Sequence, residues 1–183
     1  MRNASLALAV LLGATCFTDA SGEIVTAMGS SLAEACYSHA RLNRSTGEAV
    51  DDCTSALDEG LVLRDRAATY VNRGIILLRR GDYRRALRDF DMAIELQPDL
   101  AEAHLNRGAA LRNIDDAAGA VAALNRALEL GPREPARAYY NRGIAHEDLG
   151  ELRAAYGDYR RASELAPDWE APRVELARFR IDD

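Results

Sequence analysis

The sequence contains no lysine, so all 23 of its basic residues are arginines. This absence excludes Schiff-base chemistry on a lysine amine, and it excludes the phosphate-binding loop that requires a lysine. The chain is also acidic, with 29 Asp and Glu residues and a formal net charge of −6. We therefore expect no nucleic-acid partner, because phosphate binding requires a positively charged face.

Aromatic residues are scarce, at 6% of the chain, whereas apolar residues reach 48% and many of them are alanines. The apolar fraction is sufficient for a core and argues against disorder. Abundant alanine with few aromatics favours close-packed helices over an all-β fold. The length of 183 residues fits one domain preceded by a leader.

The first 20 residues have the layout of a secretory signal peptide. Arg2 is followed by an apolar run over residues 4–17, which is shorter than the about 20 residues that a membrane span needs. Thr18 and Ala20 provide the small residues expected before a cleavage site. We predict an exported, periplasmic protein that has no membrane span after the leader is cleaved.

Two alternatives to this leader remain open. A lipoprotein box is a poorer match, because Gly13 and Thr15 stand where such a box has Leu and Gly or Ala. A helix that belongs to the fold is the other alternative, and the flanking residues disfavour it. Residues 21–30, with the sequence SGEIVTAMGS, are predicted to form a small, flexible lead-in.

Export leaves two cysteines in the mature chain, since Cys16 lies in the leader and only Cys36 and Cys53 follow it. An even number of cysteines in an oxidising compartment indicates a disulfide, and two buried free thiols are the alternative. A catalytic thiol is not indicated, because no histidine lies at a suggestive spacing from either cysteine.

Internal repeats are the most informative feature. The triplet Asn-Arg-Gly occurs three times at spacings of 34 and 35 residues, and Glu-Leu-x-Pro recurs in step with it. Units aligned on Ala67, Ala101 and Ala136 share nine identical columns. A period of this length is typical of solenoids in which each repeat is a pair of helices.

The columns resemble the tetratricopeptide repeat (TPR) family, whose pattern has a large residue at position 4, Gly or Ala at 8, Ala at 20, an aromatic at 24, Ala at 27 and Pro at 32. The matching residues at positions 4, 8, 20, 24, 27 and 32 are Tyr70, His104 and Tyr139; Gly74, Gly108 and Gly143; Ala86, Ala120 and Ala155; Phe90, Leu124 and Tyr159; Ala93, Ala127 and Ala162; and Pro98, Pro132 and Pro167. The resemblance implies an all-α fold, a right-handed α-solenoid of antiparallel helix pairs.

Less regular segments flank the three repeats. Ala49, Cys53 and Ala56 have the 20/24/27 spacing of a second helix, so residues 31–66 are predicted to form a degenerate hairpin. In this hairpin the two cysteines face each other, and a disulfide closing the 17-residue loop would contribute about 3 kcal/mol.

A capping helix is predicted from Trp169 to Ile181, after the last repeat. Asp168 is a suitable N-cap, and Pro172 falls near the first turn, where proline is tolerated. The helix would cover the last repeat with Trp169, Leu176 and Phe179.

Three arginines occupy position 7, where the family usually has an apolar residue, and three aspartates occupy position 23. A partly buried arginine needs a partner, so we predict ion pairs between neighbouring helices, with ligand contacts as the alternative. The sequence leaves open whether each pair lies within one repeat or between two. These residues are Arg73, Arg107 and Arg142, and Asp52, Asp89 and Asp158, while the second repeat has Ala123.

In TPR proteins, first-helix positions 2, 5, 6, 9, 12 and 13 line a concave groove. The resemblance implies that Asn72, Asn106 and Asn141 form a ladder whose amides bind an extended peptide. The alternative is that these amides satisfy neighbouring polar groups. A lysine-dependent carboxylate clamp is not expected, because arginine is not equivalent to lysine. The other predicted groove residues are Val71, Ile75, Leu105, Tyr140, Ile144, Arg112 and Arg137, and Arg79 adds positive charge.

The sequence offers no catalytic constellation. His104 occupies the core-filling position 4, and no pair of histidines or cysteines has metal-ligand spacing. We therefore predict no enzyme, no cofactor and no metal.

The predicted function is a protein-interaction module of the bacterial cell envelope that binds a peptide or protein partner in the groove. The alternatives are a regulatory subunit of an envelope hydrolase or protease, and an assembly protein that self-associates. The predicted organisation is a signal peptide over 1–20, a lead-in over 21–30, the degenerate hairpin over 31–66, repeats over 67–100, 101–135 and 136–168, and the capping helix over 169–183.

Overall fold

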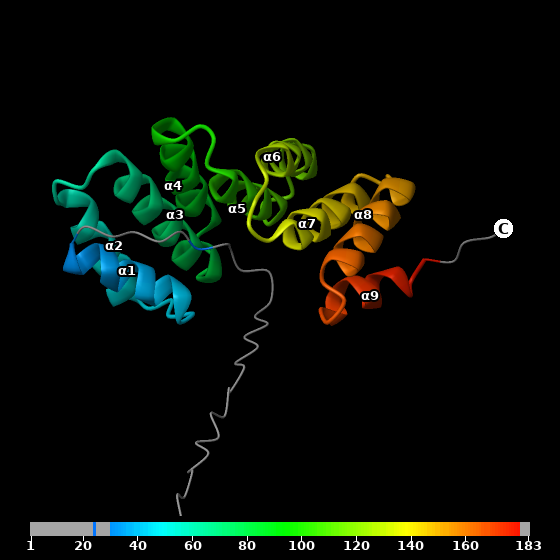
Figure 1. Cartoon of the computed structure of the whole chain (residues 1–183), viewed down its shortest axis with the longest axis horizontal. Helices are drawn as coiled ribbons and strands as arrows, with labels where there is room; N and C mark the ends of the chain where they lie inside the picture. The colour runs from blue at the N-terminus through cyan, green and yellow to red at the C-terminus, as the bar shows by residue number, and fades with distance from the viewer. Residues whose placement is uncertain (1–23, 25–29, 180–183) are drawn as a thin grey trace, which may run out of the picture.

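The computed structural model describes Ile24 and residues 30–179, and within this part every element is a helix. The predicted signal peptide lies outside the described residues. Figure 1 shows helix pairs that follow one another from α1–α2 at one end to α9 at the other. The helices are α1 Ser31–Arg41, α2 Gly47–Asp58, α3 Leu63–Arg79, α4 Tyr83–Leu96, α5 Ala101–Arg112, α6 Ala117–Leu130, α7 Pro135–Asp148, α8 Leu152–Leu165 and α9 Glu170–Leu176. The predicted all-α solenoid of antiparallel helix pairs is confirmed.

The turns between paired helices require positive φ angles, and the sequence provides suitable residues. Gly81 and Gly150 lie after α3 and α7 with φ of 80° and 75°. In the second repeat Asp115 takes this conformation with φ of 63°, which Asp tolerates better than most residues. Asp116 then caps α6 by accepting a hydrogen bond from the Gly119 amide at 2.9 Å.

Each regular repeat brings its two helices closest together where a position-8 glycine faces a large position-24 side chain. A Cβ added at Gly74 would lie 2.5 Å from Phe90 Cε1, and one added at Gly108 would lie 2.5 Å from Leu124 Cγ. The corresponding distance from Gly143 to Tyr159 Cε1 would be 2.8 Å. Real contacts this short do not occur, so only glycine permits the observed approach.

The first helices of the pairs form one layer of the solenoid. Helix α3 contacts both α1 and α5, and α5 contacts α7, whereas α4, α6 and α8 make no comparable contacts with one another in the described chain. We call the side of α3, α5 and α7 that faces away from their pair partners the inner face. The largest core cluster joins residues of α1 to α5, and Ile24 is half-buried against it.

The helices at two boundaries differ from the predicted ones. Helix α3 begins at Leu63, before the first repeat column at Ala67. The capping helix ends at Leu176 instead of Ile181, and its N-cap is Trp169, not Asp168. After the helix ends, the Phe179 ring lies on α8, with its centroid 5.8 Å from that of Tyr156 and 5.9 Å from that of Tyr159. None of the described helices is long and apolar enough to cross a membrane.

Candidate partner-binding surface

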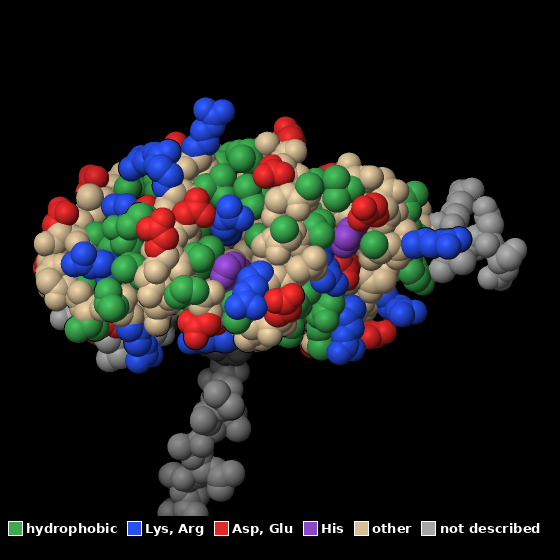
Figure 2. Space-filling view, turned by 90° about the horizontal axis from the view of Figure 1, so that it is seen from above, with side chains coloured by type: hydrophobic (Ala, Val, Ile, Leu, Met, Phe, Trp, Pro, Cys, Tyr) green, Lys and Arg blue, Asp and Glu red, His purple; other side chains and the backbone are tan. Residues whose placement is uncertain are grey.

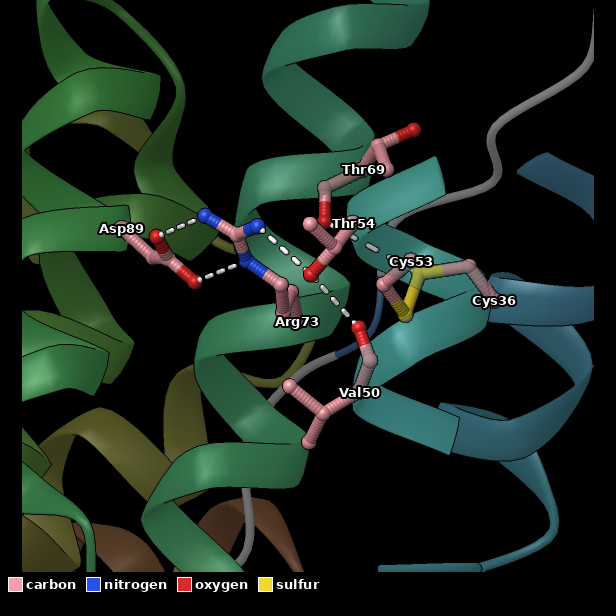
Figure 3. Close-up of polar contacts among 7 residues, drawn as sticks. All are labelled: Cys36, Val50, Cys53, Thr54, Thr69, Arg73 and Asp89. Carbon is pink, nitrogen blue, oxygen red and sulfur yellow. Dashed lines mark hydrogen bonds and ion pairs between the residues drawn. A yellow bond between two sulfur atoms is a disulfide. The ribbon is translucent and has the colours of Figure 1, made fainter. Parts of the chain in front are cut away.

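The position-7 arginine of the first repeat joins three helices (Figure 3). Arg73 Nε and Nη2 donate to the two carboxylate oxygens of Asp89 at 2.8 Å each, which links α3 to α4. Its Nη1 donates to Thr54 Oγ1 of α2 at 3.0 Å. One guanidinium therefore links the two helices of its own repeat and connects that repeat to the preceding hairpin.

The third repeat uses the same arrangement. Arg142 makes two hydrogen bonds of 2.7 Å to the carboxylate of Asp158 within the repeat. Its Nη1 donates to Asn125 Oδ1 of the preceding repeat at 2.6 Å. Bidentate pairs of this kind combine charge with fixed geometry.

The second repeat differs, because Ala123 at position 23 offers no carboxylate. Arg107 Nε instead donates to Asp91 Oδ1 in the preceding repeat at 2.7 Å. The predicted ion pairs are therefore confirmed for Arg73 and Arg142, each within its own repeat. Arg107 forms an ion pair between repeats, with an aspartate that was not predicted. In the degenerate hairpin, Asp52 lies 2.9 Å from His39 Nε2 instead of pairing with an arginine.

The partner that each arginine finds in the preceding unit was not predicted. It stands at position 25 of the preceding unit, counting from alanine at position 20. This column could have been found in the sequence, because all three of its members can accept a hydrogen bond from a guanidinium. They are Thr54, Asp91 and Asn125.

Their aspartate partners raise the pKa of two position-7 arginines, Arg73 and Arg142. Burial alone would lower the pKa of Arg73, but the hydrogen bond and charge of Asp89 raise it above its ordinary value. For Arg142 the hydrogen bond to Asp158 is the largest influence, and it raises the pKa against the effect of burial. These guanidinium groups are engaged in joining helices.

A disulfide joins Cys36 of α1 to Cys53 of α2, with the Cα atoms 4.7 Å apart (Figure 3). Cys53 stands at position 24 of the degenerate unit, and Cys36 lies five residues before the end of α1, as Gly74 does in α3. The disulfide therefore occupies the point of closest approach between the paired helices. Both cysteines are fully buried.

The asparagine ladder is not exposed. Asn72 and Asn106 are 0% exposed and Asn141 is 3% exposed. The prediction that their amides line an open groove is therefore wrong, and an incoming peptide could reach them only after the structure moves. Asn141 Oδ1 is buried without a hydrogen-bond partner in the described chain.

The apolar part of the predicted groove is also mostly buried. Val71, Ile75 and Leu105 are 0%, 0% and 1% exposed, so their prediction as accessible groove residues is also wrong. These residues are buried because the residues of α5 that face them are small. Ala103 and Ala109 belong to the same core cluster as Val71 and Ile75, and they let α5 pack directly on α3.

The accessible remainder of the predicted surface lies on α5 and α7. Tyr140, Ile144, Arg112 and Arg137 are half-buried. The Tyr140 ring lies 4.7 Å from the Trp169 ring and 5.8 Å from the Tyr159 ring, measured between centroids. These contacts hold the Tyr140 side chain in place against α8 and Trp169.

Hydrogen bonds complete this aromatic cluster. The Tyr159 hydroxyl donates to Glu147 Oε2 at 2.9 Å, and Arg178 Nη2 donates to Glu147 Oε1 at 2.6 Å. Burial, followed by the hydrogen bond to Glu147, raises the pKa of Tyr159 far above its ordinary value. Glu147 is thus engaged by two partners.

The histidines are held by local polar groups. His104 Nε2 lies 2.9 Å from the carbonyl oxygen of Pro98, and His146 Nδ1 lies 2.5 Å from Glu151 Oε2. Over the described chain, no group of three or more His, Cys, Asp or Glu side chains is arranged to hold a metal ion. Figure 2 shows one outer surface, on which basic, acidic and apolar side chains are interspersed.

Family models cover more than half of the chain. Residues 71–135 and 136–168 each match a model described as tetratricopeptide repeat. The chain belongs to the tetratricopeptide repeat family. Proteins of this family generally provide a non-catalytic protein-interaction fold. A comparison with curated proteins found no match to this TPR chain.

Solved TPR structures resemble the chain. The first TPR of Spaghetti (RPAP3) bound to the HSP90 peptide SRMEEVD is 28% identical, with a TM-score of 0.58, covering 61% of this chain and 87% of that one. The second TPR domain of human RPAP3, in complex with the HSP70 peptide SGPTIEEVD, is 25% identical, with a TM-score of 0.59 and coverages of 63% and 96%. MamA 41-end from Desulfovibrio magneticus RS-1 is 24% identical, with a TM-score of 0.65 and coverages of 80% and 82%, and shows the fold alone.

Proposed function

We propose that this TPR protein is an exported, non-catalytic interaction module of the bacterial cell envelope that captures a peptide or protein partner on its inner face. The observation that carries the proposal is the TPR array with an accessible inner-face surface on α5 and α7. Two similar TPR domains bind peptides, which supports the same role for this chain. The mixed apolar and charged character of the surface suits a polypeptide.

Two observations support export. The sequence begins with an apolar stretch that follows a single positive charge. The Cys36–Cys53 disulfide would persist in an oxidising compartment and is uncommon in a reducing cytosol. Fractionation of a bacterial host, with mass spectrometry under non-reducing conditions, tests this part. We expect a periplasmic protein with the intact disulfide, and a cytosolic protein in which Cys36 and Cys53 are free thiols would contradict it.

Partner binding is tested by affinity purification from envelope extract after cross-linking. Ile144→Asp places a charge on the accessible surface and should abolish recovery of the partner. Ala122→Asp on the exposed face of α6 is the matched control and should leave recovery unchanged. Equal loss with both variants, or no loss with either, would contradict binding on the inner face.

A further inference from the structure

We infer that the turns of the first two helix pairs form a docking site for an anionic lipid surface. The site lies at the turn ends of these helices and goes beyond the proposed function, which concerns the inner face. We call it the basic edge. It consists of Arg41, Leu42 and Arg44 at the α1–α2 turn and Arg80, Arg84 and Arg85 at the α3–α4 turn.

Hydrogen bonds bring the two turns together. Arg79 Nη1 donates to the carbonyl oxygen of Ala40 at 2.6 Å, and Arg80 Nη1 donates to the carbonyl oxygen of Ser45 at 3.0 Å. Ala40 and Ser45 flank residues 41–44, so the α3–α4 turn is joined to the α1–α2 turn at both ends of that segment. The arginines that the two turns carry therefore belong to one surface.

Positive charge exceeds negative charge at the basic edge. Its arginines, namely Arg41, Arg44, Arg80, Arg84 and Arg85, are all exposed. The acids nearby are Glu48 in the first turn of α2 and Asp82, which pairs with Arg85 at 3.5 Å. Within the described chain, no hydrogen bond or ion pair engages the side chains of Arg41, Arg44 and Arg84. These guanidinium groups can therefore bind phosphate groups through paired hydrogen bonds.

An apolar side chain lies between two of these arginines. Leu42, which follows Arg41 at the end of α1, is 49% exposed. Backbone hydrogen bonds fix its turn, from the Leu42 amide to the Ser38 carbonyl oxygen at 2.8 Å and from the Arg44 amide to the His39 carbonyl oxygen at 2.9 Å. A leucine flanked by arginines suits the boundary between lipid headgroups and acyl chains, where charge and apolar area both contribute to binding.

The turns of the last two helix pairs have the opposite character. Asp115 and Asp116 are exposed in the α5–α6 turn, and Asp148 and Glu151 are exposed around the α7–α8 turn, beside Arg153. An anionic surface would repel these turns, so the site is confined to the N-terminal end of the solenoid. These acids oppose binding there only weakly, because packed helices lie about 8–10 Å apart and salt screens exposed charges beyond about 8 Å.

The composition of the basic edge favours a lipid surface over a protein partner. A protein interface has an apolar centre and buries about 800 Å² on each side, whereas Leu42 is the one apolar member of the basic edge. A lipid surface requires only clustered positive charge and a small apolar anchor. Ile144 and Tyr140 of the candidate partner surface are not part of the basic edge, so the two sites can be tested separately.

Co-sedimentation with vesicles tests the inference. The protein is purified after expression and processing of the full chain, and the vesicles contain phosphatidylcholine alone or mixed with an equal part of phosphatidylglycerol. We expect binding to the mixed vesicles only, with loss of binding at high salt because the attraction is electrostatic. Arg41→Gln, Arg44→Gln and Arg84→Gln should each weaken binding about fivefold, since each arginine near an anionic surface contributes separately.

Matched variants at the acidic turns keep the test specific. Arg153→Gln removes an exposed arginine from the start of α8 and should leave vesicle binding unchanged. Leu42→Ser should weaken binding at least about threefold, because the apolar anchor is lost. Leu149→Ser at the α7–α8 turn changes a side chain that is 44% exposed and should have no effect. Circular dichroism melting checks that each variant is folded.

Several outcomes would overturn the inference. They are equal binding to both kinds of vesicle, no binding to the mixed vesicles at low salt, and a loss with Arg153→Gln or Leu149→Ser equal to that with Arg44→Gln or Leu42→Ser. Release of the protein by inorganic phosphate at constant ionic strength would also overturn it, because the site would then bind free phosphate.

The proposed function is tested independently of the basic edge. Ile144→Asp should abolish recovery of the partner and leave vesicle binding unchanged. If vesicle binding fails while Ile144→Asp still abolishes recovery, the basic edge is wrong and the proposed function stands. If vesicle binding follows the predicted pattern while Ile144→Asp has no effect on recovery, the proposed function fails and the basic edge stands.

Discussion

In the three regular repeats a glycine allows two helices to approach, whereas in the α1–α2 hairpin a disulfide occupies the equivalent place. Gly74, Gly108 and Gly143 face the large side chains of Phe90, Leu124 and Tyr159. The hairpin has Cys36 and Cys53 there, and neither brings comparable apolar volume. A covalent bond thus replaces packing in the unit that has the smallest interior side chains.

The polar contact between paired helices is also stronger in these repeats than in the hairpin. The first and third repeats have a bidentate arginine–aspartate pair, whereas the hairpin has a single contact between His39 and Asp52. The first and third repeats therefore have a large apolar contact and a strong ion pair. The hairpin depends more heavily on its disulfide. The comparison can be tested by removing each interaction in turn.

The largest expected effect is loss of the ion pair in the first repeat. Asp89→Ala leaves the guanidinium of Arg73 without its carboxylate, and the Arg73 side chain is only 17% exposed. We expect a loss of about 3–5 kcal/mol in the free energy of unfolding, because an uncompensated charge remains buried. Urea unfolding followed by circular dichroism measures it. A loss below about 1 kcal/mol would show that the pair does not hold the repeat together.

Loss of the disulfide is expected to cost slightly less and to act locally. Cys36→Ala with Cys53→Ala should destabilise the hairpin by about 3 kcal/mol, from the loop entropy of 17 residues. Amide hydrogen exchange should show faster exchange in α1 and α2, with little change in α7 and α8. Uniform acceleration over the whole chain would contradict the separate role of the hairpin.

The glycine contact can be tested in the second repeat. Gly108→Ala places a Cβ 2.5 Å from Leu124 Cγ, and we expect a loss of about 1–3 kcal/mol through overpacking. Adding Leu124→Ala should make the double variant less destabilised than the sum of the two single changes. Thermal unfolding of the four proteins completes the cycle. Additive losses would show that the two residues do not share a contact.

The smallest expected effect is at the ion pair between repeats. Arg107 and Asp91 are 34% and 51% exposed at their side chains, so Asp91→Ala should cost less than about 1 kcal/mol. The contrast with Asp89→Ala is the result to check, under the same urea unfolding conditions. Equal losses would mean that exposure does not set the strength of these pairs.

The repeat pattern predicted the helix pairs and the existence of the arginine pairs in the first and third repeats. Those features depend on the spacing of residues within one repeat, and the nine identical columns show that spacing. It did not predict that Arg107 would bind Asp91, because that choice depends on how two repeats stack. The end of α9 at Leu176 was also not predicted, and the Phe179 ring beyond it contacts α8 across the fold.

The candidate surface was predicted only in part. Position within a repeat indicates which side chains point toward the inner face, and Tyr140, Ile144, Arg112 and Arg137 remain accessible there. It does not indicate how closely neighbouring helices pack. Small residues such as Ala103 and Ala109 bring α5 onto α3 and bury the asparagines and aliphatic residues of the first two repeats.

Site-specific photo-cross-linking in intact cells tests the central claim most directly. A benzoylphenylalanine probe replaces Ile144 on the inner face in one strain and Ala122 on the exposed face of α6 in another. Capture of a partner by the inner-face probe alone is the predicted result. Capture by the α6 probe alone would contradict the account, because the partner would then bind the opposite side of the solenoid.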